Sequence, residues 1–220
     1  MYKGSIDWPN HIVGFIIVVG GILMAFSLER CATERREANS VDRHLQEIPE
    51  ETRFNRNNLR ELIASAEANS ARLDTMLQVI GSSEDIGELQ RRMFGLLNVH
   101  SAYLKRNAYE LFVQTGDVRF VESFELKSDM IVLYEYCTWV ETQNTLMLQT
   151  YKERFFDYIV ENLNLSTIGP RATLADYRSR EFINGVSSYR YFIGSCLRVY
   201  REALERMDEF LESYEQEFPT

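Results

Sequence analysis

Cysteine is scarce in this sequence, which excludes the sites that depend on several thiols. The 220 residues include three cysteines, Cys31, Cys137 and Cys196, which are widely spaced and odd in number. They therefore form neither a disulfide framework nor a CxxC metal site. We expect buried thiols at these positions, because a free cysteine packs as a small apolar side chain.

Histidines and catalytic motifs are also few. The three histidines, His11, His44 and His100, each lack a second histidine or cysteine three or four residues away. The chain has no glycine-rich phosphate loop, no GxSxG elbow and no HExxH sequence, and no serine has an evident base partner. His11 lies where a membrane edge is expected and could ligate a haem or pigment, but an interfacial polar residue is the preferred interpretation. We therefore expect no enzyme activity, no metal site and no bound cofactor.

Basic residues are in deficit, with 24 Lys and Arg against 33 Asp and Glu and a net charge of −9. Phosphates would be repelled, so nucleic acid is not an expected partner. Alternation of period two is missing as well, whereas apolar residues recur at spacings of three and four. The expected fold class is all-α, with one N-terminal transmembrane helix that continues into a coiled-coil-like helical bundle.

A long apolar run stands near the start of the chain. Ile12 to Leu28 contains seventeen residues without a charge and with one hydroxyl group. At ~1.5 Å per residue this run forms ~26 Å of helix, and the residues from Trp8 onward extend it to the ~30 Å thickness of the hydrocarbon core. We interpret residues 11–28 as a single transmembrane helix surrounded by membrane lipids.

Two other interpretations of this run compete with the anchor, and the second is rejected. A cleavable signal peptide is one, because Lys3 gives a weakly basic start and Ala25-Phe26-Ser27 has the small-x-small pattern of a cleavage site. The length of the run favours the anchor. Lipid modification of Cys31 is the other, and Glu29 and Arg30 argue against it because such a site needs small residues there.

Small residues share one face of the predicted membrane helix, at spacings of four, three and four: Gly14, Val18, Gly21 and Ala25. Membrane helices associate largely through close packing of small residues, so this face is predicted to contact another membrane helix. The alternative is that glycine is simply common in membrane helices. The expected membrane-interface anchors flank the span: Trp8, Arg30, Arg35 and Arg36.

The rest of the chain is expected to consist of a tail, a long juxtamembrane helix and a bundle. Residues 1–10 are expected to be an N-terminal tail and residues 29–80 a long juxtamembrane helix. A kink or break is expected at Pro49, because its ring removes one helical hydrogen bond and crowds the preceding turn. Residues 81–220 are expected to form one helical bundle domain.

Capping signals divide the bundle into helices. Ser82, with Asp85 three residues later, predicts the start of a short helix that ends near residue 98. Asn107 predicts the start of a second helix that stops at Gly116. Asp117 is expected to be a turn residue in a short extended connector over residues 117–121.

The second half of the bundle is expected to contain its longest helices. A helix rich in aromatic residues is predicted from Ser123 to about residue 164, followed by a loop over residues 165–172 that contains Gly169-Pro170. One more helix or helix pair ends the chain. Four large aromatic side chains are predicted to be buried between the two long helices: Trp139, Phe156, Phe192 and Tyr200.

Two stretches resemble a bacterial family called DUF6090. The run from Ile12 to Arg36, which includes IIVVGGILMAFSLERCATERR, looks like that family's anchor, in which an IVLVVIGILIAL-type helix precedes an Asn-Asn-Trp-Asn-Glu-like segment. The run AYELFVQTGDVRFV, residues 108–121, is similar to the family's TYEELxxSGxLxLI motif and is followed, as there, by a helix that begins Glu125-Leu126. Leu28-Glu29-Arg30-Cys31 departs from the pattern, and the family's basic N-terminal extension is missing. The resemblance, over residues 10–160, implies a single-pass membrane protein with a helical domain and no assigned chemistry.

Three function classes are compatible with these features. The preferred one is a non-catalytic accessory or structural subunit of a larger membrane complex, whose partners are the transmembrane helices and surfaces of other subunits. The alternative is a single-pass sensor or signalling protein whose helical domain binds a ligand or partner. A membrane-tethered enzyme has little support. We expect the complex to be an energy-transducing one, photosynthetic or respiratory, because such assemblies are abundant in membranes.

Two arguments about the side of the membrane disagree. Only Lys3 precedes the span, whereas Arg30, Arg35, Arg36 and Arg43 follow it, and the positive-inside rule then places the domain in the cytoplasm. The family that the chain resembles carries a basic segment before its anchor, which implies an exported domain. We expect a bacterial inner-membrane protein with a periplasmic domain, because a charge count can be overridden.

Overall fold

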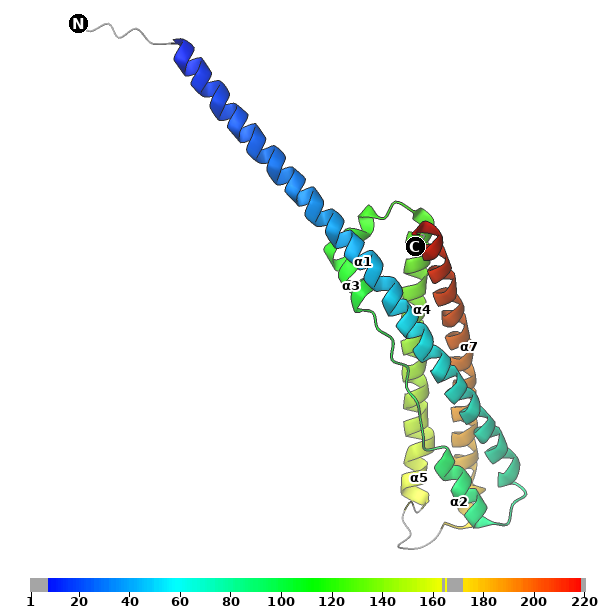
Figure 1. Ribbon diagram of the computed structural model, residues 1–220. Coiled ribbons are helices and arrows are strands. Elements are labelled where there is room, and N and C mark those ends of the chain that lie inside the picture. Colours follow the sequence, from blue (N-terminus) through cyan, green and yellow to red (C-terminus); the bar gives the residue numbers. More distant parts are fainter. Residues whose placement is uncertain (1–7, 164, 166–171, 219–220) are drawn as a thin grey trace, which may run out of the picture.

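The computed structural model describes residues 8–163, 165 and 172–218, and all regular secondary structure in these ranges is helical. This confirms the all-α fold class. Figure 1 shows an elongated molecule in which one helix extends far beyond a bundle of three long helices. The expected tail, residues 1–10, falls largely outside the described residues.

The extending helix is α1 (Trp8–Ile80), a single helix of 73 residues. Its N-terminal part contains a segment long and apolar enough to cross a membrane, with a mean hydropathy of 1.9 in the best window and no residue of that window buried. Every described side chain from residue 21 to residue 36 is exposed, and the first buried one is that of Val41. From Val41 to Ile80 the same helix is part of the bundle core.

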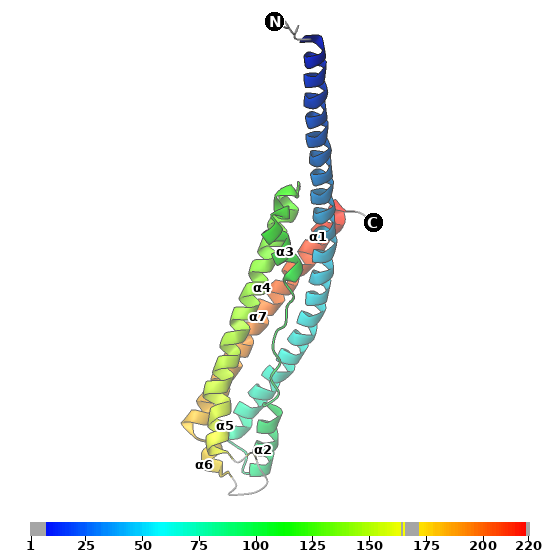
Figure 2. The same cartoon turned by 90° about the vertical axis from the view of Figure 1, so that its left-hand side faces the viewer.

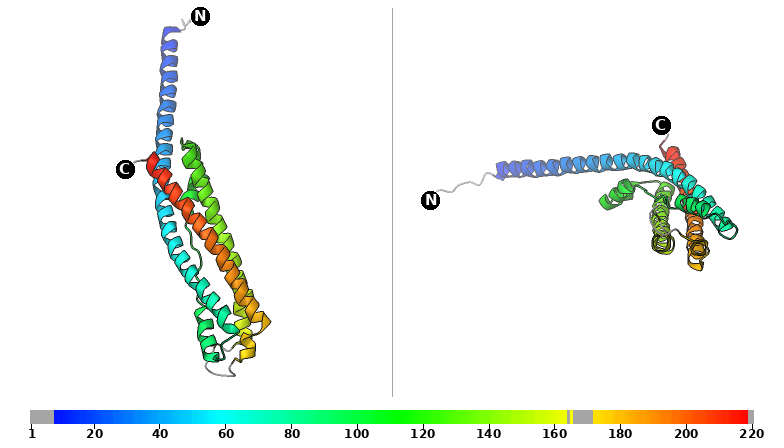
Figure 3. Two further views of the ribbon diagram at one scale, coloured as in Figure 1. Left: turned by 90° about the vertical axis from the view of Figure 1, so that its right-hand side faces the viewer. Right: turned by 90° about the horizontal axis from the view of Figure 1, so that it is seen from below.

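Of the kink or break expected at Pro49, the break is wrong, because α1 is continuous through this residue. A proline inside a helix costs roughly 3 kcal/mol, but the turns on both sides of Pro49 are held by tertiary contacts. Ile48 is fully buried, and the buried Thr52 donates its hydroxyl to the Ile48 carbonyl at 2.9 Å. Figure 3 shows α1 curving gently over its light-blue and cyan part instead of breaking.

The bundle consists of α1, α4 (Phe124–Thr150) and α7 (Arg180–Glu217), and α7 packs against both of the others. The helices α1 and α4 run in the same direction, and α7 runs antiparallel to them (Figure 2). Between α1 and α4 the chain forms α2 (Ile86–Gly95) at the end remote from the anchor, returns as an extended connector, and forms α3 (Asn107–Thr115) beside α1. Because α1 and α4 are parallel, this return crosses the whole length of the bundle.

Short elements complete the chain. A 3₁₀ helix, η1 (Asp117–Phe120), joins α3 to α4 and replaces the expected extended connector. A π-helical segment, η2 (Tyr151–Phe156), and α5 (Asp157–Asn162) continue α4, so the long helix expected from Ser123 is confirmed, with the Ser123 side chain as its cap. The final helix pair is α6 (Leu174–Tyr177) and α7. Most of the expected loop, residues 165–172, lies outside the described residues.

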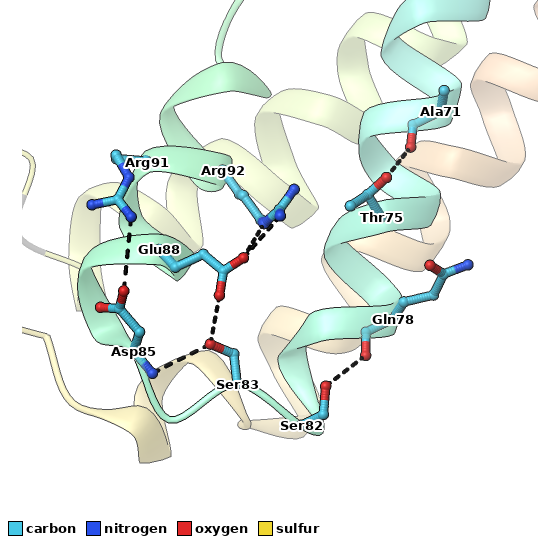
Figure 4. A network of polar contacts seen from close by, with 9 residues as sticks. All are labelled: Ala71, Thr75, Gln78, Ser82, Ser83, Asp85, Glu88, Arg91 and Arg92. Atoms are coloured by element: carbon cyan, nitrogen blue, oxygen red, sulfur yellow. Dashed lines mark hydrogen bonds and ion pairs between the residues drawn. The ribbon is translucent and has the colours of Figure 1, made fainter.

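The predicted N-cap residues of α2 and α3 are wrong, although both helices are present. The N-cap of α2 is Asp85, not Ser82, and the hydroxyl of Ser83 accepts a hydrogen bond from the Asp85 N–H and donates one to Glu88, as Figure 4 shows. Asn107 is the first residue of α3 instead of its cap. The predicted stop is confirmed, because Gly116 has φ 78°, a left-handed conformation that glycine adopts without strain.

The predicted burial of Trp139 is wrong, because its side chain is 37% exposed. The buried stripe of α4 includes Cys137 and Val140, and Trp139 lies between them in sequence and off the stripe, with its ring against Tyr136. Tyr200 is buried as predicted, with 1% exposure. Two of the predicted core residues are only half-buried at the edge of the core: Phe156 and Phe192.

A close approach between α7 and η2 gives a first prediction. A Cβ atom on Gly185 would collide with the carbonyl oxygen of Arg154, whereas one on Gly194 would meet nothing. Gly185→Ala should therefore lower the free energy of unfolding by about 1–3 kcal/mol through overpacking. Gly194→Ala, in the same helix, should raise it by about 0.5–1 kcal/mol because alanine favours helix. Urea unfolding of both variants tests this, and equal effects would contradict the close packing of η2 on α7.

Candidate functional site

The predicted helix-packing face lies in the exposed part of α1. Gly14, Val18, Gly21 and Ala25 are all exposed, and a Cβ on Gly14 or Gly21 would meet no neighbouring atom. The described residues therefore leave this face free for another helix or for lipid.

The predicted interface residues are placed in the same helix. Trp8 begins α1, and its side chain, like that of His11, is outside the described part. Arg30, Arg35 and Arg36 are exposed on the part of α1 between the apolar run and the bundle, residues 29–40, which we refer to as the stalk. Arg30 pairs with Glu34 at 2.8 Å. An exposed pair of this kind contributes little to stability, so these charges remain available to solvent or headgroups.

A buried polar cluster joins α1 to the α3–η1 corner. The fully buried ring of His44 contacts the carboxylate of Asp117 through Nδ1 at 2.9 Å, and the Ser40 hydroxyl donates to the same oxygen at 2.8 Å. Burial raises the pKa of Asp117, but hydrogen bonds from Ser40, Thr115 and His44 outweigh this and leave that pKa below its ordinary value of 3.8. The carboxylate is therefore charged at neutral pH. The sequence predicts Asp117 only as a turn residue, because its partner His44 is 73 residues away.

A second buried carboxylate lies almost two turns further along α1. Glu51 accepts a hydrogen bond from the Tyr134 hydroxyl at 2.5 Å and another from the N–H of Ala108 at 3.0 Å. Ala108 is in the first turn of α3, where a negative charge is stabilising. Burial and the neighbouring Glu51 raise the pKa of Tyr134, so this phenol acts only as a donor. We refer to the His44–Asp117–Ser40 and Glu51–Tyr134–Ala108 groups as the corner contacts.

The extended connector, residues 96–106, is held by side-chain amides. Asn55 of α1 makes two hydrogen bonds of 2.7 Å to the backbone of Lys105, one to its N–H and one to its carbonyl. Asn144 of α4 accepts from the N–H of Ala102 at 3.1 Å. Buried backbone groups need partners, and a single extended segment has no neighbouring strand to supply them. The two asparagines fill that role.

A pocket of about 360 Å³ lies between α1 and this connector. At its edge the Ser65 hydroxyl is 2.7 Å from Nδ1 of His100, so the expectation that no serine has a base partner is wrong. Among the described residues no carboxylate bonds the other ring nitrogen of His100, so the third group that orients a nucleophilic pair is missing.

The three cysteines are free thiols, and two of them are buried. Cys137 and Cys196 are buried as expected, and burial raises the pKa of Cys137 to about 12 and raises that of Cys196. Cys31 is exposed on the stalk, so burial was wrong there. Within the described ranges no three His, Cys, Asp or Glu side chains gather where they could hold a metal ion.

Comparison with known proteins adds no relative. No family model, curated protein or solved structure matches this chain. Membership of the DUF6090 family stays a prediction from the two quoted motifs.

The corner contacts give a second prediction. Asp117→Asn should lower the free energy of unfolding by about 1–3 kcal/mol at pH 7, because it removes a charged acceptor from a buried cluster. The folded-state pKa of Asp117 is depressed, so its stabilisation is present above pH 3.8 and is lost as the pH falls through the lower folded value. The difference between the two proteins should shrink in that acid range. Chemical unfolding at a series of pH values measures it.

Asp42→Asn is the matched control, because Asp42 lies on α1 between the cluster residues Ser40 and His44 and is exposed. It should change stability by less than about 0.5 kcal/mol at every pH. An equal loss in both variants would show that Asp117 contributes only general surface charge.

Proposed function

We propose that this protein is a single-pass membrane protein and a non-catalytic accessory subunit of a larger membrane complex. The observation that supports this most is the continuity of α1, which runs from the exposed apolar segment into the bundle core as one helix. A helix without a hinge fixes both the distance and the rotation of the bundle relative to its anchor. A subunit that braces others needs such a fixed geometry.

The dimensions are consistent with this role. Residues 29–40 separate the apolar run from the first buried residue of the bundle, Val41, and they correspond to about 18 Å of helix. Most of these residues are exposed and many are charged. The bundle is therefore held away from the bilayer by a polar stalk, with space for another subunit beside the stalk.

Two exposed aromatic residues belong to the elements nearest the stalk. Phe120, the last residue of η1, is 41% exposed, and Phe124, the first residue of α4, is 80% exposed. Phe120 also lines a groove of about 350 Å³ together with Glu34, Glu37 and Asp42 of α1. Apolar rings beside carboxylates suit a partner surface that carries both apolar and basic residues. The type of complex, expected to be energy-transducing, stays a prediction.

The second candidate is a sensor, and the pocket against α1 is the observation that favours it. A ligand bound between α1 and the connector would contact the same helix that forms the anchor. Native mass spectrometry of gently solubilised membranes separates the two candidates. Stable co-migration with other subunits supports the accessory role, whereas a lone monomer or homodimer would refute it and favour the sensor.

The proposed topology places the bundle in the periplasm. Protease added to intact spheroplasts should digest residues 40–220. Protection of this domain, while a periplasmic marker is cleaved, would place it in the cytoplasm instead.

The predicted anchor face provides a third prediction. Gly21→Leu should reduce co-purification with the complex, because a large side chain on this face prevents close approach of another helix, and it should leave membrane insertion intact. Gly20→Leu is the control, since the same substitution one position away points about 100° around the helix. Equal co-purification of the two variants would count against this face as the contact.

The rigid stalk provides a fourth prediction. Two alanines inserted after Thr33 should weaken association, because they rotate the bundle by about 200° relative to the anchor. Four inserted alanines rotate it by about 400°, which returns it to within about 40° of its original phase, and should weaken association less. The amount of complex recovered from membranes is the measurement. If both insertions leave it unchanged, anchor and bundle do not bind one rigid partner together.

A further inference from the structure

The pocket between α1 and the connector has an inner extension that the proposed function does not use. Ser65 and His100 line both the outer pocket and a smaller chamber behind it. The chamber measures about 20 Å³, which is room for about one non-hydrogen atom. Tyr189 and Tyr200 of α7 form its far wall. The two spaces adjoin each other through these shared residues, so we consider them as the wide and the narrow end of one candidate site.

The narrow end contains an unpaired acceptor. Asn69 lines the chamber and is only 5% exposed. Its amide nitrogen donates to the Tyr189 hydroxyl at 2.8 Å, while its Oδ1 is buried without a hydrogen-bond partner among the described residues. A buried carbonyl oxygen without a partner is unfavourable. A group that enters the chamber should therefore carry an N–H or O–H donor.

The wide end carries a negative charge. Glu61 lines the mouth and is exposed, and it forms no ion pair with any described residue. No lysine or arginine lines the outer pocket or the chamber. The charge of the site therefore favours cations and disfavours anions.

An apolar wall connects the two ends. Leu59, Leu62 and Leu104 line the pocket between the mouth and the chamber. Glu61 and Asn69 are eight residues apart on α1, which corresponds to about 12 Å along the helix axis. A ligand that satisfies both ends has a donor at each terminus and an apolar middle.

We propose that this site binds a linear aliphatic diamine or polyamine. One ammonium group donates to Asn69 Oδ1 in the chamber, where the rings of Tyr189 and Tyr200 also favour a cation. The methylene chain lies against the leucines, and the other ammonium pairs with Glu61 at the mouth. This inference stands independently of the accessory role, because the site lies on the side of the bundle lined by the connector and not at the stalk.

Calorimetric titration of the full chain in nanodiscs of zwitterionic lipid, at about 0.15 M salt, is the test, because salt screens weak surface binding. The probes are putrescine, cadaverine and spermidine, with n-pentylamine and pentanediol as single-charge and neutral controls. At least one diamine or polyamine should bind at least about tenfold more tightly than either control, since only it combines a donor in the chamber with a positive charge at Glu61. Equal binding of all probes, or none at millimolar concentration, would overturn the proposal.

Variants locate the binding site. Glu61→Gln should weaken diamine affinity about three- to fivefold and leave pentanediol unchanged, whereas Glu205→Gln, an exposed carboxylate on α7, should change neither. Asn69→Leu fills the chamber and removes its acceptor, and should weaken affinity about tenfold or more. Because Asn69→Leu could also disturb folding, the melting temperature of this variant is compared with that of the wild type. If the melting temperature is lower, the Glu61→Gln variant alone decides the outcome. Equal effects of Glu61→Gln and Glu205→Gln would show nonspecific attraction to an acidic protein and refute the site.

Discussion

The return of the chain between two parallel helices is the constraint on which this fold depends. Because α1 and α4 run in the same direction, the chain after α2 must travel back along the bundle before α4 can begin. An extended segment covers more than twice the distance per residue of a helix, so the connector achieves this with few residues. Its backbone then lacks the partners that a helix or sheet provides, and Asn55 and Asn144 supply them from both sides.

Local sequence signals were sufficient to predict most of the helices. Helical spacing predicted α4 and α7, Ser123 marked the start of α4, and Gly116 marked the end of α3 because only a left-handed residue closes a helix in that way. Pro49 and Trp139 show where local signals fail. Packing of the neighbouring turns keeps Pro49 within one helix. In α4, large apolar residues lie on exposed as well as buried faces, so the sequence does not reveal that Trp139 is off the buried stripe.

The polar sites depend on contacts between distant residues. His44 and Asp117 are 73 residues apart, Glu51 and Tyr134 are 83 apart, and Ser65 and His100 are 35 apart. Nothing near His44 in the sequence indicates that it will be buried beside a carboxylate, because the path of the connector decides which residues meet. The same holds for the pocket, whose two walls come from α1 and from the connector.

The contact of α1 with the bundle from Val41 to Ile80 has a mechanical consequence. A pull on the N-terminal segment acts along the axis of α1, parallel to its interface with α7. In this geometry the load is shared by all side-chain contacts of the interface at once, as in shearing, and does not open them one by one as in peeling. Forced detachment is then governed by the rate at which the whole interface unfolds. Tension on the anchor is thus carried by the contacts along the whole interface of α1 with α7 and not by those nearest the membrane alone.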